Sequence, residues 1–268
     1  MGANTKQLRN RIKSVDSTLH LTKAMGLVAS SKMRRALQGM KNGREYELAV
    51  KNAIDPLIGS TECASSPYMS QNEGKKQCLI VIAGDRGLAG GYNANIFRAL
   101  REYEDTEIIA IGKRACDRFK QKPISAEQFD YQSARELSVK LCQGFKQGQY
   151  SRVGILCTKY VSMMTQEPHI KWMLPLQGGE QTKGTSVVFE PDELTVLDLA
   201  VPEYVAGMIV ASVRESFASE IAARRNAMDS AGKNAQEMID ELSLEYNRAR
   251  QGAITQEITE IVAGSGAQ

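Results

Sequence analysis

The chain has 268 residues, of which 42% are hydrophobic and 24% are charged, and its formal net charge is +3. This is the composition of an ordinary globular protein, and it excludes disordered and collagen-like architectures. Uninterrupted apolar stretches such as residues 78–83 are far shorter than the ~20 residues that cross a bilayer, so no transmembrane helix is expected. The residues after Met1 show neither a secretory signal nor a transit peptide, so the mature protein is expected to start near residue 1.

Cysteine and histidine usage indicates neither disulfides nor a metal site. The five cysteines are Cys63, Cys78, Cys116, Cys142 and Cys157. Their odd number and the lack of a C-x-x-C spacing argue against a disulfide framework and a zinc site, and favour a reducing compartment. His20 and His169 lie in no ligand pattern and are expected to be surface or packing residues. We therefore expect no metal and no cofactor.

Charge is distributed unevenly along the chain. Residues 1–55 contain 11 Lys and Arg against 4 Asp and Glu, residues 56–202 are balanced, and residues 203–268 contain 6 against 10. The basic segment is either a solvated helix face or a surface for an acidic partner. Because no aromatic residue precedes Tyr46, the interleaving typical of single-strand binders is missing, and nucleic acid is not an expected partner.

The first segment repeats in alternating steps of four and three. The repeating positions are Leu8, Ile12, Val15, Leu19, Thr22, Gly26, Ala29, Met33, Ala36, Met40, Gly43, Glu47, Val50, Ile54 and Leu57. A period of 3.5 residues predicts a helix that supercoils left-handedly with a partner. Its roughly 50 residues would make a rod of about 75 Å. Small residues in the middle of this seam bury little area, so the rod would need outside support. The alternative is an amphipathic helix folded back on the core.

A second helical pattern extends from about residue 204 to 262. We expect Pro202 to open it, since proline is tolerated in a first helical turn. Two long helices at the two ends of one chain, one basic and one acidic, predict an intramolecular antiparallel left-handed coiled coil. The uneven charge would then be electrostatic complementarity between the two helices.

The middle of the chain has a different pattern. Short β-rich runs at 78–83, 107–111 and 152–157 alternate with helical stretches at 93–103, 113–120 and 133–147. This alternation predicts a Rossmann-like α/β domain with a small parallel sheet, to which residues 185–189 would add a later strand. The polar segment 59–76 is predicted to be a linker. The predicted organisation is an N-terminal coiled-coil helix at 1–58, a central α/β domain with linkers at 59–200, and a C-terminal coiled-coil helix at 201–268.

A glycine-rich turn at residues 84–93 follows the first predicted strand. Such turns bind phosphates in many α/β domains, because helix N-terminal amides point at the anion. Here the spacing matches neither G-x-G-x-x-G nor the P-loop, and G-x-S-x-G is also absent. We therefore expect a tight structural turn stabilised by Asp85 and Arg86.

Three sequence blocks then carry a resemblance to one family. The C-terminal helix contains ARRNAM from Ala223, NA at 234–235, YNRARQ from Tyr246 and ITQEITEIVAG from Ile254. The N-terminal helix contains LTKAM from Leu21 and VASSKM from Val28, and the central turn is GDRGLAGGYN. In this order, and over the whole chain, the blocks strongly resemble the gamma subunits of F-type ATP synthases, in the bacterial form.

The resemblance implies a rotor that is not itself catalytic. In this family the two terminal helices form a shaft inside a ring of three alpha and three beta subunits, and the α/β domain contacts the epsilon subunit and the membrane ring of c subunits. Ion flow turns the ring, and the shaft drives the beta subunits through ATP synthesis, or pumps ions in reverse. The implied location is the cytoplasmic face of the bacterial inner membrane, with membrane contact only through the c ring.

The resemblance also assigns site residues. Contacts with the alpha and beta subunits are expected at Lys23, Met25, Arg224, Arg225, Arg250, Gln251, Thr255 and Glu257. A foot near the c ring and epsilon is expected at Phe189, Glu190 and Pro191. Ordinary packing of Met25 and solvated charges at Arg224 and Arg225 are the simpler alternatives, since an exposed ion pair contributes only ~0–1 kcal/mol. The cysteine-bearing insertion of plastid relatives is missing, so no redox switch is expected.

Two other function classes stay open on the residues alone. One is a nucleotide-binding transferase or hydrolase that uses its helices to oligomerise, against which the missing phosphate loop counts. The other is a coiled-coil adaptor whose basic helix binds acidic protein surfaces.

Overall fold

The computed structural model describes residues 2–70, 72, 76–103, 105–178 and 188–265. The chain forms two compact units, one made of Met1–Ala29 with Arg225–Gln268 and the other of Ser30–Arg224. Two long helices contribute to both units: α1 (Gly2–Ile58) and α5 (Glu193–Ser265). Both predicted terminal helices are therefore present.

The start of α5 differs from the prediction. The helix begins at Glu193, and Pro202 lies inside it. Asp192 caps its first turn, because its carboxylate accepts hydrogen bonds from the Thr195 backbone N–H and from the Thr195 hydroxyl, both at 2.8 Å. A polar cap placed before an irregular apolar stretch was a weaker sequence signal than the proline.

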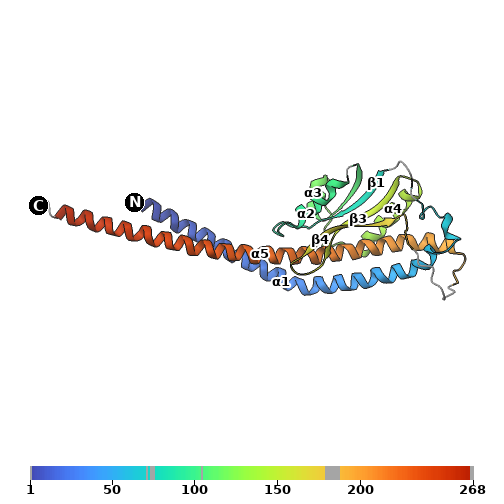
Figure 1. The fold of residues 1–268 in the computed structure, drawn as a ribbon, viewed down its shortest axis with the longest axis horizontal. Helices are drawn as coiled ribbons and strands as arrows, with labels where there is room; N and C mark the ends of the chain where they lie inside the picture. Colours follow the sequence, from blue (N-terminus) through green and yellow to red (C-terminus); the bar gives the residue numbers. More distant parts are fainter. Residues whose placement is uncertain (1, 71, 73–75, 104, 179–187, 266–268) are drawn as a thin grey trace. The chain divides into compact units, whose positions relative to one another are not determined.

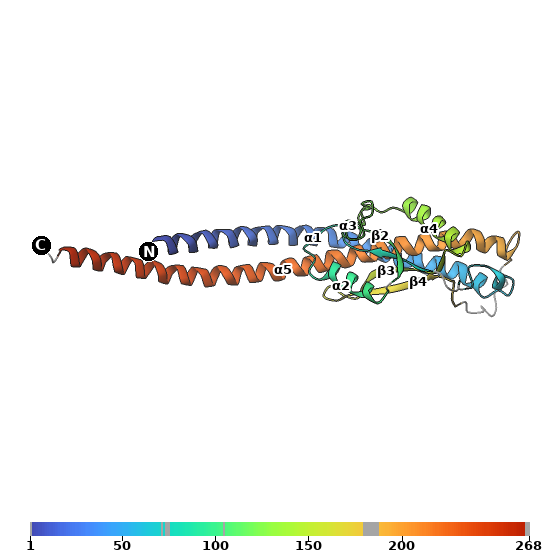
Figure 2. The same cartoon turned by 90° about the horizontal axis from the view of Figure 1, so that it is seen from above.

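In the first unit, the start of α1 packs against the end of α5. A Cβ on Gly26 would lie 3.7 Å from the Met228 Cβ, whereas Gly232 faces Thr22 and Leu19. Because positions later in α5 meet positions earlier in α1, the pair is antiparallel, and both chain ends lie at the same end of it (Figures 1 and 2). The predicted coiled coil is confirmed in this unit.

The second unit is built on a four-stranded sheet. Its strands are β1 (Lys76–Ile82), β2 (Thr106–Ile111), β3 (Tyr150–Tyr160) and β4 (Gln166–Leu174), in the order β2-β1-β3-β4. The three predicted strands are confirmed and pair in parallel. β4 was not predicted, and it returns antiparallel to β3.

Two other expectations have different outcomes. The predicted strand at 185–189 lies mostly outside the described residues, and its described positions, Val188 and Phe189, are not in a strand. The segment predicted as a linker contains a 3₁₀ turn at Cys63–Ser65, and it buries Cys63 and Tyr68 in the core. It is therefore part of the packed domain.

Helices cover both faces of the sheet. One face packs on α1, α5 and α4 (Tyr131–Lys146), and the other on α2 (Tyr92–Ala99) and α3 (Lys113–Phe119), with a 3₁₀ turn at Leu100–Glu102 (Figure 1). Alternate residues of β1 separate the two cores: Ile80 and Ile82 face the long helices, while Leu79 and Val81 face α2 and α3. The predicted α/β architecture is confirmed, with a mixed sheet in place of a parallel one.

The seam of α1 continues in the second unit. Met33, Ala36, Met40, Gly43, Glu47, Ile54 and Leu57 are all buried there. A Cβ on Gly43 would lie 3.3 Å from the Ala211 Cα on α5, and one on Gly207 would meet Tyr46 at 2.9 Å. The glycines therefore let the two helices approach closely, as the small-residue seam predicted.

One stretch of α5 is as apolar as a membrane span. It covers 18 residues with a mean hydropathy of 1.6, and 67% of it is buried inside the structure. Burial of this kind is typical of a helix at the centre of a folded domain.

Candidate functional site

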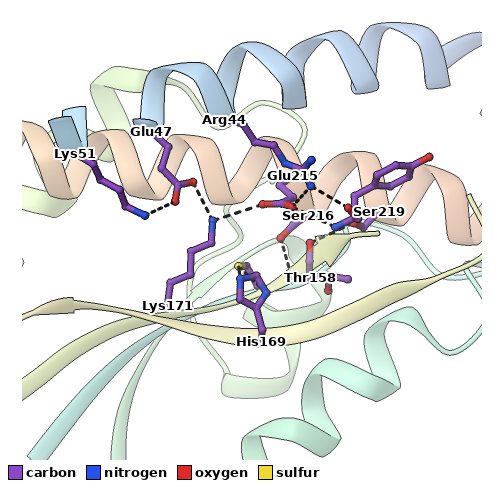
Figure 3. Close-up of polar contacts among 11 residues, drawn as sticks. Arg44, Glu47, Lys51, Thr158, His169, Lys171, Glu215, Ser216 and Ser219 are labelled. Carbon is purple, nitrogen blue, oxygen red and sulfur yellow. Dashed lines mark hydrogen bonds and ion pairs between the residues drawn. The ribbon is translucent and has the colours of Figure 1, made fainter. Parts of the chain in front are cut away.

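Five charged side chains in the second unit join α1, α5 and β4 (Figure 3). The Lys171 ammonium on β4 lies 2.9 Å from a Glu47 carboxylate oxygen on α1 and 3.5 Å from a Glu215 oxygen on α5. Lys51 donates to the other Glu47 oxygen at 3.0 Å, and Arg44 to the other Glu215 oxygen at 2.6 Å. We call Arg44, Glu47, Lys51, Lys171 and Glu215 the ion-pair ladder.

The two carboxylates and the central cation of the ladder are mostly shielded from water. The exposed fraction of the side chain is 11% for Glu47, 4% for Glu215 and 17% for Lys171. Burial alone would raise the pKa of Glu47, but attraction and hydrogen bonds from Lys171 and Lys51 hold it below its ordinary value. Burial would lower the pKa of Lys171, yet the negative groups around it raise it. Glu47 and Lys171 are therefore both charged at neutral pH.

Small hydroxyl side chains bring α5 close to the end of β3. The Thr158 backbone N–H donates to the Ser216 hydroxyl at 3.1 Å, and the Ser219 hydroxyl donates to the Thr158 carbonyl at 3.2 Å (Figure 3). The Tyr160 N–H donates to Glu215 at 3.3 Å. Polar side chains of α5 thus satisfy backbone groups of β3, and these hydrogen bonds fix the position of α5 along the strand.

A cavity of about 670 Å³ lies beside the ladder. Leu48, Lys159, Val161 and His169 line it together with ladder residues. The His169 ring lies 3.8 Å from the Cys157 sulfur, measured at Nδ1. Burial, with repulsion from Lys171, lowers the pKa of His169, and burial raises the pKa of Cys157 to about 12. His169 is therefore a neutral packing residue at pH 7 and Cys157 an unreactive thiol.

Asp85 fastens the glycine-rich turn to residues 113–127, in agreement with the structural role predicted for it. Its carboxylate accepts hydrogen bonds from the Ser125 hydroxyl and from the N–H groups of Lys113, Ala126 and Glu127. Burial opposes these bonds, but together they lower the pKa of Asp85. At Arg86 it is the backbone carbonyl that takes part, accepting a hydrogen bond from the Asn93 side-chain amide at 3.3 Å. The turn thus uses its polar groups for its own geometry.

Arg224 differs from the other residues expected to contact a partner. It is only 9% exposed, and its guanidinium donates to Glu220 at 2.5 Å and to the Gly87 carbonyl at 3.3 Å. It therefore fastens α5 to the glycine-rich turn.

The remaining residues expected to contact alpha and beta subunits lie in the first unit. Lys23 on α1 is exposed and Met25 is half-buried, whereas Arg225, Arg250, Gln251, Thr255 and Glu257 on α5 are all exposed. The Thr255 hydroxyl donates to the Gln251 carbonyl at 3.0 Å within the helix. Apart from half-buried Met25, these side chains present a surface to the surroundings of the unit.

The expected foot lies just before α5. Phe189 is half-buried and packs against the core of the second unit, whereas Glu190 and Pro191 are exposed. An anchored aromatic residue beside two exposed residues is a geometry that can present a short contact surface.

The ion-pair ladder was not among the sites predicted from the sequence. One signal was available, because Glu47 occupies a position of the apolar heptad seam. A carboxylate at a buried seam position requires a buried cation. Its partner Lys171 lies on β4, the strand that the sequence did not reveal. Among the described residues no group of three or more His, Cys, Asp or Glu side chains could hold a metal ion, and all five cysteines are buried free thiols.

The known proteins that the chain resembles belong to ATP synthases. The family model described as ATP synthase matches residues 4–267. The chain is 41% identical over 281 residues to the ATP synthase gamma chain of Ruminococcus albus, covering 98% of each. It is 37% identical over 300 residues to the sodium ion specific gamma chain of Acetobacterium woodii, covering 100% of this chain and 99% of the relative.

Solved structures share the fold. A chain in the Euglena gracilis mitochondrial ATP synthase assembly of OSCP, F1 and c-ring superposes with a TM-score of 0.68 at 17% identity, covering 100% of this chain and 95% of that chain. A chain of the rotor from the same organism gives a TM-score of 0.64 at 16% identity, covering 95% of this chain and 100% of that one. The paired helices and central sheet thus form one known architecture.

Proposed function

The chain belongs to the family of ATP synthase gamma chains, and on that premise we propose that it is the central-stalk rotor of a bacterial F-type ATP synthase. The family resemblance of the sequence blocks is confirmed by identities of 37% and 41% over nearly the whole chain. This full-length similarity is the observation that carries the proposal.

The shaft of this rotor is the antiparallel pair of α1 and α5. It would stand within three alpha and three beta subunits. The proposed contacts with these subunits are Lys23, Met25, Arg225, Arg250, Gln251, Thr255 and Glu257. Arg224 would support this surface from the glycine-rich turn, to which it is bonded. Ile254, Ile258 and Ile261 support this, because they are 43%, 56% and 71% exposed in the chain alone. Exposed apolar side chains in a row mark a surface that a partner covers.

The central domain would connect the shaft to the membrane ring. Phe189, Glu190 and Pro191 are the proposed foot on the c ring and the epsilon subunit. Attachment would be peripheral, at the cytoplasmic face of the inner membrane. Ion flow turns the ring, and the rotating shaft presents different faces to the beta subunits, which then bind, condense and release ADP, phosphate and ATP.

We propose that the chain is not catalytic by itself. The glycine-rich turn directs Asp85 inward and uses it for hydrogen bonds within the domain. The purified chain should therefore hydrolyse no ATP, and hydrolysis should appear only with alpha and beta subunits. Activity of the chain alone would overturn this part of the proposal.

Reconstitution with alpha and beta subunits tests the rotor assignment. A complex with three copies of each around one copy of this chain is expected, and failure to assemble it would contradict the proposal. Met25→Lys places a long cation on the shaft, and it should impair ATP synthesis and ion pumping more than assembly. Asn52→Lys adds the same charge at an exposed position of α1 in the second unit and serves as the control. Equal coupling in both variants would remove Met25 from the contact surface.

A further inference from the structure

We propose that the ion-pair ladder transmits torque between the sheet of the central domain and the two long helices. The inference rests on the proposed rotor function, and it identifies the contacts through which torque would pass from the sheet to the helices. Lys171, Glu47 and Glu215 are positioning residues in this role, because they would act through the helices and the strand that they join.

The geometry places a single side chain between three elements. Lys171 belongs to β4, and its ammonium bonds Glu47 of α1 at 2.9 Å and Glu215 of α5 at 3.5 Å (Figure 3). Arg44 of α1 completes the set, because its guanidinium donates to Glu215 at 2.6 Å and to the Tyr160 carbonyl of β3 at 2.9 Å. Each long helix is thereby bonded to the sheet and to the other helix.

These contacts add directional resistance to the packing of the core. Apolar burial is non-directional, so the hydrophobic effect by itself specifies no single alignment of a helix on the sheet. Charge-assisted hydrogen bonds are directional and weaken steeply when their atoms are displaced. Because Glu215 and Lys171 are only 4% and 17% exposed, salt and water screen them little. A rotor that carries load needs contacts of this kind where torque enters the shaft.

Stability alone does not account for charge at these positions. Glu47 occupies a seam position where the neighbouring seam residues are mostly apolar or small. Replacing a buried ion pair with apolar residues of similar volume is often neutral or stabilising. Folding free energy alone therefore does not explain why charged side chains stand here in place of apolar ones, and directional resistance is what the geometry of the ladder adds.

The other ion pairs of the domain offer a matched control. Arg135 on α4 lies 2.8 Å from Glu203 on α5, at side-chain exposures of 55% and 39%. This pair joins α5 to α4 instead of to the sheet, and it is open to water. Removing it should leave torque transmission unchanged.

The test loads the shaft through the central domain. In the reconstituted complex a bead is attached at Arg101→Cys, an exposed position before β2, where labelling is selective because all five native thiols are buried. The angular fluctuations of the bead measure torsional stiffness, and ion pumping per ATP hydrolysed in membrane vesicles measures coupling. The variants are E47L/K171M/E215L, which replaces the charged side chains with apolar ones, K171R, and the control pair R135M/E203Q.

The apolar triple variant should assemble and hydrolyse ATP, but its bead fluctuations should broaden and its pumping per ATP should fall. K171R keeps a cation that can bond both carboxylates, so it should retain wild-type stiffness, as should R135M/E203Q. If the triple variant folds poorly, K171M alone is measured below its melting temperature with the same readouts. Wild-type stiffness and coupling in the triple variant, or in K171M, would overturn the proposal. Failure of the wild-type chain to rotate would instead overturn the rotor function, and this inference with it.

Discussion

The two compact units of the chain bury very different amounts of apolar surface. Among the residues of the unit 1–29 and 225–268 whose side chains the structure describes, the buried apolar ones are Leu8, Leu19, Ala29, Met228, Ala235 and Leu242. The unit of residues 30–224 has a core on each face of its sheet, with side chains such as Phe145 and Ile155 wholly buried. The second unit contains the packing of an independent domain, and the first has only a narrow seam.

This difference shows how a shaft differs from a domain. Most helix stability in proteins comes from packing of an apolar face. Two helices joined by a narrow seam, with Ile258 and Ile261 more than half exposed, leave apolar surface for surrounding subunits to cover. The first unit should therefore gain its rigidity in the assembly, whereas the second should keep its structure in the chain alone.

The largest predicted effect is on the stability of the second unit, residues 30–224. Gly112 has a φ of +93°, and a Cβ there would lie 1.9 Å from the Ala83 carbonyl oxygen, so Gly112→Ala must displace a strand end. We expect a loss of about 4 kcal/mol in the free energy of unfolding, measured by urea denaturation. Gly178→Ala is the control, because its φ is +77° with nothing within 4 Å, and it should cost about 1 kcal/mol. Equal losses would show that the close approach is not what requires glycine.

Matched truncations in the two units test the comparison directly. Ile80→Ala opens a cavity in the central strand and should cost about 2–5 kcal/mol in the isolated chain. Leu242→Ala should cost less than about 2 kcal/mol, since its surroundings can collapse onto the smaller side chain. Hydrogen exchange of the β1 amides and of the 235–249 amides separates the two effects. Loss of β1 protection in Leu242→Ala equal to that in Ile80→Ala would contradict the independence of the two units.

Acid should weaken the domain unit partly through Glu47. The pKa of Glu47 is about 4.5 in the unfolded chain and lower in the folded chain. The contribution of Glu47 to stability is therefore present above pH 4.5 and is lost as pH falls through the folded pKa. Glu47→Gln should cost about 1–3 kcal/mol at pH 7 and should flatten the decline below pH 4.5. Glu45→Gln, on the same helix at an exposed site, is the control. An unchanged acid slope in Glu47→Gln would contradict the lowered pKa of Glu47 in the folded chain.

The smallest predicted effect concerns His169. Burial and the nearby Lys171 and Lys159 lower its pKa, while Glu215 and Glu47 oppose them. As pH falls, the His169 imidazole is protonated in the unfolded chain before it is protonated in the folded chain. The free energy of unfolding should therefore decline below about pH 6.5, and His169→Gln should remove that decline. Thermal melting between pH 5 and 8 measures it, with His20→Gln at an exposed site as the control. A decline that persists in His169→Gln would assign it to another group.

Periodicity made much of the architecture predictable. Each described seam position from Leu8 to Leu57 is buried or half-buried, because a helix repeats its apolar face every 3.5 residues whatever lies opposite. The strands at 78–83, 107–111 and 152–157 were predictable because buried parallel strands are continuous apolar runs. β4 was not predicted: Glu167, His169 and Lys171 alternate with Pro168, Ile170 and Trp172, so this strand has no continuous apolar run, and Pro168 argues against a strand.

The candidate site was only partly accessible to the same reasoning. The sequence blocks identified exposed positions such as Arg250 and Gln251 by resemblance, and Asp85 by its place in the turn. Arg224 shows the limit, because its sequence block does not reveal that its guanidinium turns inward to Glu220 and Gly87. Only the packing of α5 on the turn decides that orientation.

The sequence by itself determined that this protein has two long helices and an α/β domain, that the N-terminal segment is basic and the C-terminal segment acidic, and that the chain resembles gamma subunits. Each of these features depends on the order of residues along a single stretch of the chain, so it can be read without knowing which stretches meet in the fold. The tertiary structure decided which charges meet: Lys171, Glu47 and Glu215 are separated by more than forty residues from one another and converge only because β4 pairs with β3 beneath both helices. Pairing between distant charges depends on register and burial, and neither is encoded locally.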